Sequence, residues 1–311
     1  MTSASRDRDL RSQLETLTTE AFRPELADVD RLPTPEIARL MNAEDASVAG
    51  AVAEQVPAIA AAIDAVAERM ARGGRLIYAG AGTAGRLGVL DASECPPTFN
   101  TDPSRVVGLI AGGPQAMVSP VEGAEDSPEL AESDLAALGL TPDDTVVGIS
   151  ASGRTPYAVG AVTYARKRGA LTVGLSCNRD SALAAAAEHG IEVVVGPEFL
   201  TGSTRLKAGT AQKLVLNMIS TITMIRLGKT YGNLMVDVRA SNEKLRARSR
   251  RIVAQVTGAD DDAVERALAA TDGEVKNAIL VLLAGVDGPT AARLLVEADG
   301  HLRAALAAAG S

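Results

Sequence analysis

The sequence has little of the side-chain chemistry that usually carries redox, metal or nucleophilic catalysis. Its 311 residues include two histidines, two cysteines and no tryptophan. Cys95 and Cys177 cannot build a disulfide framework, and their separation does not fit the paired C-x-x-C spacing of a zinc site. We expect both thiols to be small buried residues, so carboxylates become the leading candidates for proton transfer.

Positive charge and aromatic rings are also scarce. The formal net charge is −8, the pI is near 5.0, and Phe and Tyr together number seven. A nucleic-acid-binding surface needs clustered Lys and Arg, and single strands also need rings on which bases stack. We therefore expect no nucleic-acid partner, and any anionic ligand must be held by a local group of residues.

Long hydrophobic runs are absent as well. The first residues, "MTSASRDRDL", are charged, and the longest apolar run, "AILVLLAGV" at 278–286, is far shorter than the roughly 20 residues that span a bilayer. We therefore expect a cytoplasmic protein without a membrane partner.

The middle of the chain alternates between short β-rich runs and helical stretches. The β-rich runs lie at 75–80, 106–112, 144–150, 171–177 and 191–196. Helical patterns at 155–169 and 180–189 separate the later ones. Near-continuous apolar strands that alternate with helices predict an α/β fold, a doubly wound parallel sheet in a three-layer sandwich. Ligands bind such sheets at the carboxyl ends of the strands.

Helical segments flank this region. Apolar side chains recur at helical spacing over 36–72 and again over 207–227, and Asp-Gly and Gly-Pro turns separate short helices past residue 250. We divide the chain into a helical lead-in at 1–50, a sheet domain at 51–250 and a small helical domain at 251–311.

The first glycine-rich loop, "GAGTAGR" at 80–86, fits the G-x-G-x-x-G pattern of dinucleotide-binding folds. The next strand does not end in the acidic residue that would hold a ribose, so the match is weak. We expect Gly82 and Thr83 to approach a smaller ligand, with a purely structural turn as the alternative.

The second loop, "SASGRTP" at 150–156, follows a strand and precedes a helix. It offers hydroxyls from Ser150, Ser152 and Thr155, a turn at Gly153 and a charge at Arg154. Together with the free N–H groups at a helix start, these residues predict an anion cradle of the kind that binds phosphate. The alternative is that the hydroxyls are ordinary helix caps.

The third loop, "TGSTRLKAGTAQK" at 201–213, places polar and cationic side chains before a long helix. In an acidic protein such a cluster suggests an anionic substrate, and we predict contacts from Ser203, Thr204 and Lys207.

Two acidic stretches complete the candidate site. Glu94 lies in "LDASECPPTF", where two prolines that restrict the backbone follow after Cys95. Glu125 lies in "SPVEGAEDSPEL", which also contains Glu122 and Asp126. We expect both stretches to lie near the carboxyl ends of the strands, where two carboxyls can act as an acid/base pair.

Five blocks of the sequence, taken together, carry a family resemblance. They are "GRLIYAGAGTAGRLGVLDASECPPTF", "VEGAEDS", "VVGISASGRTPY", "TGSTRLKAGTAQKLVLNM" and "GNLMVDVRASNEKL". In this order they resemble the signature blocks of the N-acetylmuramic acid 6-phosphate etherases, which belong to the sugar isomerase (SIS) fold group. The resemblance covers about residues 15 to 311. Ala84 departs from it, because the family often has a serine there.

The resemblance implies a function for each part of the chain. Residues 51–250 would form the SIS sugar-phosphate domain and 251–311 a UBA-like helical domain. The family converts N-acetylmuramate 6-phosphate and water into N-acetylglucosamine 6-phosphate and D-lactate, usually as a homodimer, with no metal or organic cofactor. By motif, Glu94 resembles the family's acid that protonates the departing lactate and activates the incoming water. Glu125 resembles the family's second catalytic glutamate, which the resemblance implies is the base at C2.

Two other readings remain open. An SIS-fold phosphosugar isomerase also moves a C2 proton, but isomerases of this group commonly carry a glutamate on the helix that corresponds to 208–227, which has no Asp or Glu here. A non-catalytic sugar-phosphate sensor, similar to the glucokinase regulatory proteins, is the alternative from another class.

Overall fold

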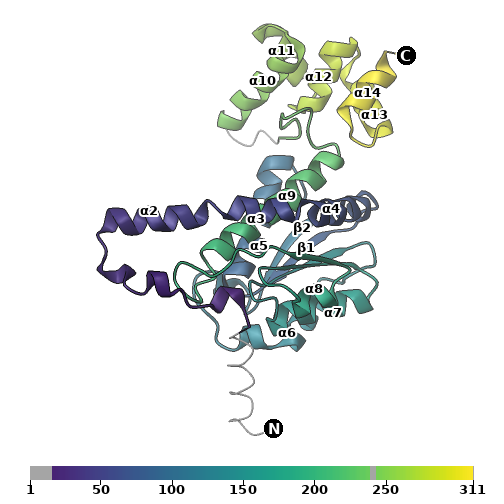
Figure 1. The fold of residues 1–311 in the computed structure, drawn as a ribbon. Helices are drawn as coiled ribbons and strands as arrows, with labels where there is room; N and C mark the ends of the chain where they lie inside the picture. Colours follow the sequence, from purple (N-terminus) through teal and green to yellow (C-terminus); the bar gives the residue numbers. More distant parts are fainter. Residues whose placement is uncertain (1–15, 239–242, 311) are drawn as a thin grey trace. The chain divides into compact units, whose positions relative to one another are not determined.

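A computed structural model of the protein describes residues 16–238 and 243–310 (Figure 1). The chain divides into two compact units. One comprises Met1–Ser93 with Ser104–Ile219, and the other comprises Glu94–Pro103 with Ser220–Ser311. The last part of the block "GNLMVDVRASNEKL" includes residues 239–242, which lie outside the described residues.

The first unit is built on a five-stranded sheet. The strands are β1 (Leu76–Gly80), β2 (Val106–Ile110), β3 (Thr145–Ile149), β4 (Leu171–Ser176) and β5 (His189–Glu192). They run parallel in the order β2-β1-β3-β4-β5. β2 therefore lies on one side of β1, and β3, β4 and β5 follow one another on its other side. The predicted α/β fold with a parallel sheet is confirmed.

Helices cover both faces of this sheet (Figure 1). On one face, α6 (Pro128–Ala137) and α7 (Pro156–Lys167) pack on Ile77 and Ala79 of β1. The intervening residue, Tyr78, points the other way, and its hydroxyl donates to Asp91 of α5 (Gly82–Phe99) at 2.7 Å. Successive side chains of a strand alternate between faces, so α5 lies on the opposite face from α7.

The opposite face is closely packed. A Cβ added at Gly88 of α5 would lie 2.9 Å from the Cβ of Tyr78, so only a glycine lets the helix approach the strand this closely. The next long helix, α9 (Lys207–Arg226), lies beside α5, because Asn217 donates to Asp91 at 2.6 Å.

The helical pattern predicted at 36–72 is confirmed and forms three helices. These are α2 (Thr34–Asp45), α3 (Val48–Glu54) and α4 (Val56–Ala71). Pro57 at the start of α4 lacks an N–H and its ring would clash with a preceding helical turn, so the helix restarts there. Ahead of them, single 3₁₀ turns occupy Thr18–Glu20, Pro24–Leu26 and Val29–Arg31.

The prediction also misplaced the last strand and the helix before it. α8 covers only Ala182–Ala186 rather than 180–189, because Ser181 caps it and the chain is already extended at His189. β5 therefore starts two residues before the predicted 191 and ends at Glu192. A histidine followed by glycine resembles a helix end in the sequence, whereas here both residues pair with β4.

In its described residues the second unit contains five further helices. They are α10 (Glu243–Thr257), α11 (Asp261–Ala269), α12 (Val275–Ala284), α13 (Gly288–Glu297) and α14 (Leu302–Ala309). α12 supplies much of their shared core, including Ile279 and Leu280. In the described residues no single helix is long and apolar enough to cross a membrane, although two bent helix pairs, Thr34–Glu54 with Val56–Ala71 and Val275–Ala284 with Gly288–Glu297, reach that length together.

Candidate active site

A cavity of about 550 Å³ opens where β1 and β3 end. It brings together most of the residues that the sequence suggested as ligand contacts. These are Gly82, Thr83, Ser150, Ser152, Arg154, Thr155 and Thr204, together with Glu125 and its neighbour Asp126. Ala84 also lines the cavity.

The loop after β3 turns its hydroxyls toward one another. Ser150 Oγ lies 2.8 Å from Thr155 Oγ1 and 3.2 Å from Ser152 Oγ. Gly153 closes the turn with a positive φ of 68°, and its N–H donates to Ser150 Oγ at 3.0 Å. A Cβ on Gly153 would lie 2.4 Å from Ser181 Cβ, so this position supports the loop from behind and does not line the cavity.

The start of α7 adds a positive end to this loop. Thr155 is the N-cap residue, but its side chain makes no capping hydrogen bond, and Pro156 has no N–H to satisfy. The alternative that these hydroxyls merely cap the helix is therefore wrong for Thr155, whose hydroxyl pairs with Ser150 instead. Uncapped N–H groups at a helix start attract anions, and phosphate oxygens fit hydroxyls and N–H groups at this spacing.

Glu125 reaches the cavity from a 3₁₀ turn, Ala124–Asp126, after β2. Gly123 precedes it in the left-handed conformation, with φ at 73°, and the turn packs against α7. An exposed carboxylate therefore lies in the same cavity as the hydroxyl loop. The sequence prediction that this acidic stretch lies at the carboxyl ends of the strands is confirmed.

Glu94 stands apart from the predicted residues that line this cavity. Glu94 is exposed on α5, twelve residues beyond Gly82, which corresponds to about 18 Å along a helix axis. It is not among the residues that line the cavity. Of the two acidic stretches, the one with Glu125 lines the cavity, whereas Glu94 lies further along α5. Pro96 and Pro97 lie within the same helix, and Cys95 separates them from Glu94.

Two of the three predicted contacts from the third loop lie elsewhere. Lys207 is 3% exposed, and its Nζ binds Glu44 of α2 at 2.8 Å. The pKa of Glu44 is lowered, mainly by hydrogen bonding from Arg23. Burial raises this pKa, and hydrogen bonding from Lys207 lowers it further. The lysine thus joins α2 to the start of α9, and neither it nor Ser203 lines the cavity.

Three residues that sequence reasoning missed line the cavity. Leu17 and Glu20 come from the N-terminal segment, which Asn178 holds by accepting hydrogen bonds from the N–H and hydroxyl of Thr18 at 2.8 and 2.9 Å. Only long-range contacts place this segment, so no local pattern could reveal it. Gln212 on α9 lies inside the third loop's motif, but the contacts predicted from that motif are Ser203, Thr204 and Lys207.

Gln212 is an unusual part of the cavity wall. The residue is 1% exposed, and its Nε2 has no hydrogen-bond partner within the described residues. Leaving a buried amide unpaired costs about 1–3 kcal/mol. Such an atom is explained if a ligand oxygen accepts its hydrogen bond.

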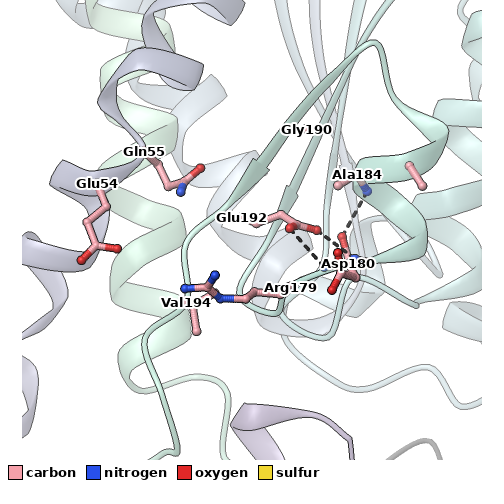
Figure 2. Close-up of a pocket in the computed structure, with 10 residues that line it drawn as sticks. Glu54, Gln55, Arg179, Asp180, Ala184, Gly190, Glu192 and Val194 are labelled. Atoms are coloured by element: carbon pink, nitrogen blue, oxygen red, sulfur yellow. Dashed lines mark hydrogen bonds between the residues drawn. The ribbon is translucent and has the colours of Figure 1, made fainter.

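A second cavity of about 520 Å³ lies at the β5 edge of the sheet (Figure 2). Figure 2 shows Glu54 and Gln55 on one side and Arg179, Asp180 and Glu192 on the other. Glu192 accepts N–H bonds from Asp180 and Ser181 at 3.1 and 2.8 Å, so its carboxylate holds the turn before α8. None of the site residues predicted from the sequence lines this cavity.

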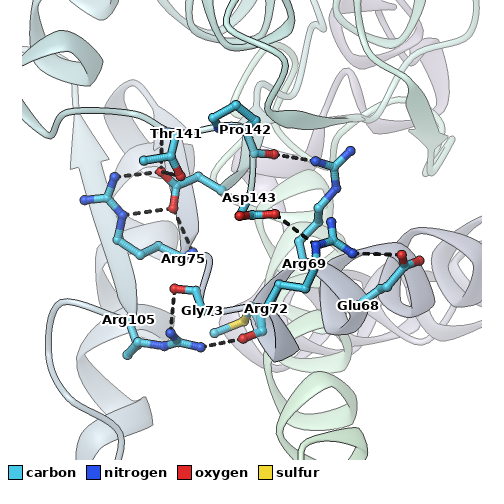
Figure 3. A network of polar contacts seen from close by, with 11 residues as sticks. Glu68, Arg69, Arg72, Gly73, Arg75, Arg105, Thr141, Pro142 and Asp143 are labelled. Carbon is cyan, nitrogen blue, oxygen red and sulfur yellow. Dashed lines mark hydrogen bonds and ion pairs between the residues drawn. The ribbon is translucent and has the colours of Figure 1, made fainter.

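A polar network fixes the other ends of β1 and β3 (Figure 3). Asp144, 1% exposed, accepts hydrogen bonds from the backbone and guanidinium of Arg75 and from the backbone of Thr141. Burial is the largest single influence and would raise the pKa of Asp144, but these hydrogen bonds together outweigh it and lower that pKa. The two strands whose carboxyl ends frame the cavity are thus tied at their amino ends.

The fold and the cavity together define an SIS protein. The family model described as "SIS domain" matches residues 120–222, and that described as "Glucokinase regulatory protein N-terminal SIS domain" matches residues 58–166. These ranges contain the hydroxyl loop, Glu125 and β1 to β3.

Relatives that align over the whole chain identify the family within the SIS proteins. An N-acetylmuramic acid 6-phosphate etherase of Streptomyces avermitilis is 84% identical over 309 residues, covering 99% of each chain. One of Rubrobacter xylanophilus is 63% identical and covers 94% of this chain and 97% of its own. The chain belongs to the N-acetylmuramic acid 6-phosphate etherase family. Among solved structures, a putative phosphosugar isomerase of Bacteroides fragilis aligns with 62% of this chain and 90% of its own at 23% identity and a TM-score of 0.47.

Proposed function

We propose that this protein cleaves the D-lactyl ether of N-acetylmuramic acid 6-phosphate with water, giving N-acetylglucosamine 6-phosphate and D-lactate. It acts as a carbon–oxygen lyase in the catabolism of a cell-wall sugar. The observation that carries the proposal is the 84% identity to an etherase over the full length of both chains. The cavity supports it, because it pairs a phosphate-type loop with a carboxylate.

The phosphate is held by the loop after β3. The hydroxyls of Ser150, Ser152 and Thr155 donate to its oxygens, and the start of α7 adds N–H groups and the positive end of the helix dipole. Arg154 lines the same cavity and supplies a full charge. Binding the phosphate fixes the position of the sugar chain relative to Glu125.

The chemistry proceeds by elimination and then hydration. In the ring-opened sugar the C1 aldehyde acidifies the C2 proton, and Glu125 removes it. The electron pair of the C2–H bond forms a C2–C3 double bond as the C3–O bond breaks and lactate departs with a proton from an acid. Water then adds at C3, and a proton returns to C2. Positioned acid and base groups of this kind contribute about 10²–10⁴-fold each.

We propose that Glu94 is the acid and that the second chain of a homodimer supplies it. Glu94 of the same chain does not line the cavity, but it is exposed and available to a second chain. Glu94 of one chain would then complete the cavity of the other. The alternative acids are Glu20 and Asp126, which line the cavity of their own chain.

The test is product formation from N-acetylmuramate 6-phosphate in deuterated water. We expect one D-lactate per substrate consumed and deuterium at C2 of the product. Glu125→Gln should lower both signals by about 100-fold or more, because it removes the base. Glu132→Gln, the same change on an exposed residue of α6, is the matched control and should leave both unchanged.

Other outcomes separate the rival functions. A sensor would bind the phosphosugar and release no lactate. An isomerase would exchange the C2 proton of a phosphosugar without breaking the ether. Either result from the unaltered protein would contradict the proposal.

A further inference from the structure

A smaller cavity, of about 280 Å³, adjoins the main one. The two share four lining residues, namely Ala81, Gly82, Thr83 and Glu125. Glu125 thus stands between the hydroxyl loop on one side and this second space on the other. A substrate whose reacting carbon lies at Glu125 can extend into both.

Arg86 is the cation in the lining of the smaller cavity. Its Nε donates to the carbonyl of Met117 at 3.0 Å, and its Nη2 donates to the carbonyl of Ala116 at 2.7 Å. These two bonds use one edge of the guanidinium group and fix its orientation. Three of its five N–H donors remain, and they include the Nη1–Nη2 edge, which can bind a carboxylate through two parallel hydrogen bonds.

The charge of Arg86 is not used elsewhere. In the part of the chain that the structure describes, no salt bridge pairs Arg86 with a carboxylate, whereas Lys207 and Arg23 are both paired with Glu44. Glu122 and Glu125 also line the smaller cavity, and their negative charges repel an anion that enters it. An anion therefore binds there only through direct contact with Arg86.

The remaining lining suits a short aliphatic group. Ala111, Ala116 and Val121 contribute apolar surface. The loop that carries Val121 is held close, since a Cβ at Gly112 would lie 2.7 Å from the Cβ of Val121. A space bounded by small apolar side chains and one oriented guanidinium fits a methyl group beside a carboxylate.

We propose that the smaller cavity binds the D-lactyl group of the substrate, and that Arg86 holds its carboxylate. This inference rests on the proposed function. The phosphate lies at the hydroxyl loop, the lactyl group lies at Arg86, and C2 and C3 lie between them at Glu125. Arg86 thereby distinguishes the ether substrate from phosphosugars that lack a carboxylate, and it holds the leaving group in place while the C3–O bond breaks.

The test compares two ligands on one variant. Arg86→Met should raise the KM for N-acetylmuramate 6-phosphate by about 10- to 100-fold, the range expected for hydrogen bonds to a charged group. The inhibition constant of N-acetylglucosamine 6-phosphate, which lacks the lactyl group, should change by less than about threefold. Arg86→Lys should recover part of the loss, because it keeps the charge without the bidentate edge.

A substrate analogue sharpens the comparison. With the lactyl carboxylate converted to a carboxamide, the unaltered protein should lose affinity and Arg86→Met should show little further loss. If Arg86→Met weakened the binding of both ligands equally, Arg86 would only hold the loop at Ala116 and Met117, and the proposal would be overturned. An unchanged KM for the substrate would also overturn it. Failure of the proposed function would appear separately, as absence of lactate release by the unaltered protein.

Discussion

Gln212 shows how a single side chain can be more informative in the structure than in the sequence. Its amide nitrogen is buried in the cavity wall without a partner among the described residues, which costs stability in the unliganded protein. A protein keeps such a group when a ligand repays the cost. We therefore assign Gln212 a hydrogen bond to the sugar phosphate.

The prediction for Gln212→Met separates binding from folding. The KM should rise by about fivefold, equivalent to one neutral hydrogen bond, while the free energy of unfolding in urea should stay the same or rise, because an unpaired buried donor is gone. Gln255→Met, on an exposed residue of α10, is the matched control and should alter neither. An unchanged KM for Gln212→Met, or a clear loss of stability, would contradict the assignment.

Some residues of the site can be predicted from the sequence because they lie close together in the chain, and others cannot because their neighbours are distant in the chain. Ser150, Ser152 and Thr155 lie within six residues of one another, so a local pattern contains the cradle they form. Lys207 looked available because its partner, Glu44, lies 163 positions earlier in the chain. Glu94 was assigned to the strand ends from its closeness in sequence to the first glycine loop, but α5 carries it about 18 Å along the helix.

At the scale of elements, the sheet was predictable and the helix breaks were less so. Strands buried on both faces read as apolar runs, and all five were found, with only β5 displaced. The helical pattern predicted over 36–72 is divided into three helices, and the last of them begins next to Pro57, a residue that interrupts helices and is visible in the sequence. The secondary structure of His189 depends on a tertiary contact, because His189 belongs to a strand only through its pairing with β4.

The pairing of Asp144 with Arg75 stabilises the sheet beneath the cavity, and it gives a prediction with a defined pH dependence. Because the hydrogen bonds lower the folded-state pKa of Asp144, its stabilisation is fully present above the unfolded pKa of about 4 and is lost as the pH falls toward the lower folded value. Asp144→Asn should cost about 2–3 kcal/mol of unfolding free energy at pH 7, since it leaves a partly buried Arg75 unpaired.

The measurement is urea unfolding of both proteins from pH 7 to pH 3. The difference between them should be largest at pH 7 and should shrink below about pH 4, where the aspartate itself becomes protonated. Asp143→Asn is the matched control, because Asp143 pairs with Arg72 at the surface, where such pairs contribute about 0–1 kcal/mol. A loss for Asp144→Asn that is independent of pH would point to packing rather than charge.

At the scale of the whole molecule, one chain lines the two adjoining cavities with the hydroxyl loop, Glu125, Gln212 and Arg86, and Glu94 is not among the residues that line either cavity. The elimination needs both a base and an acid. The central claim of the proposed mechanism is therefore that the working unit is a homodimer in which Glu125 of one chain acts with Glu94 of the other.

Subunit mixing tests this claim most directly. Glu94→Gln and Glu125→Gln are purified separately, combined in equal amounts, dissociated and reassembled, and assayed for lactate release. Random pairing makes about half of the dimers mixed, each with one intact cavity, so the mixture should recover about a quarter of the unaltered activity. A mixture no more active than its two components, when unaltered protein regains activity after the same treatment, would contradict the claim.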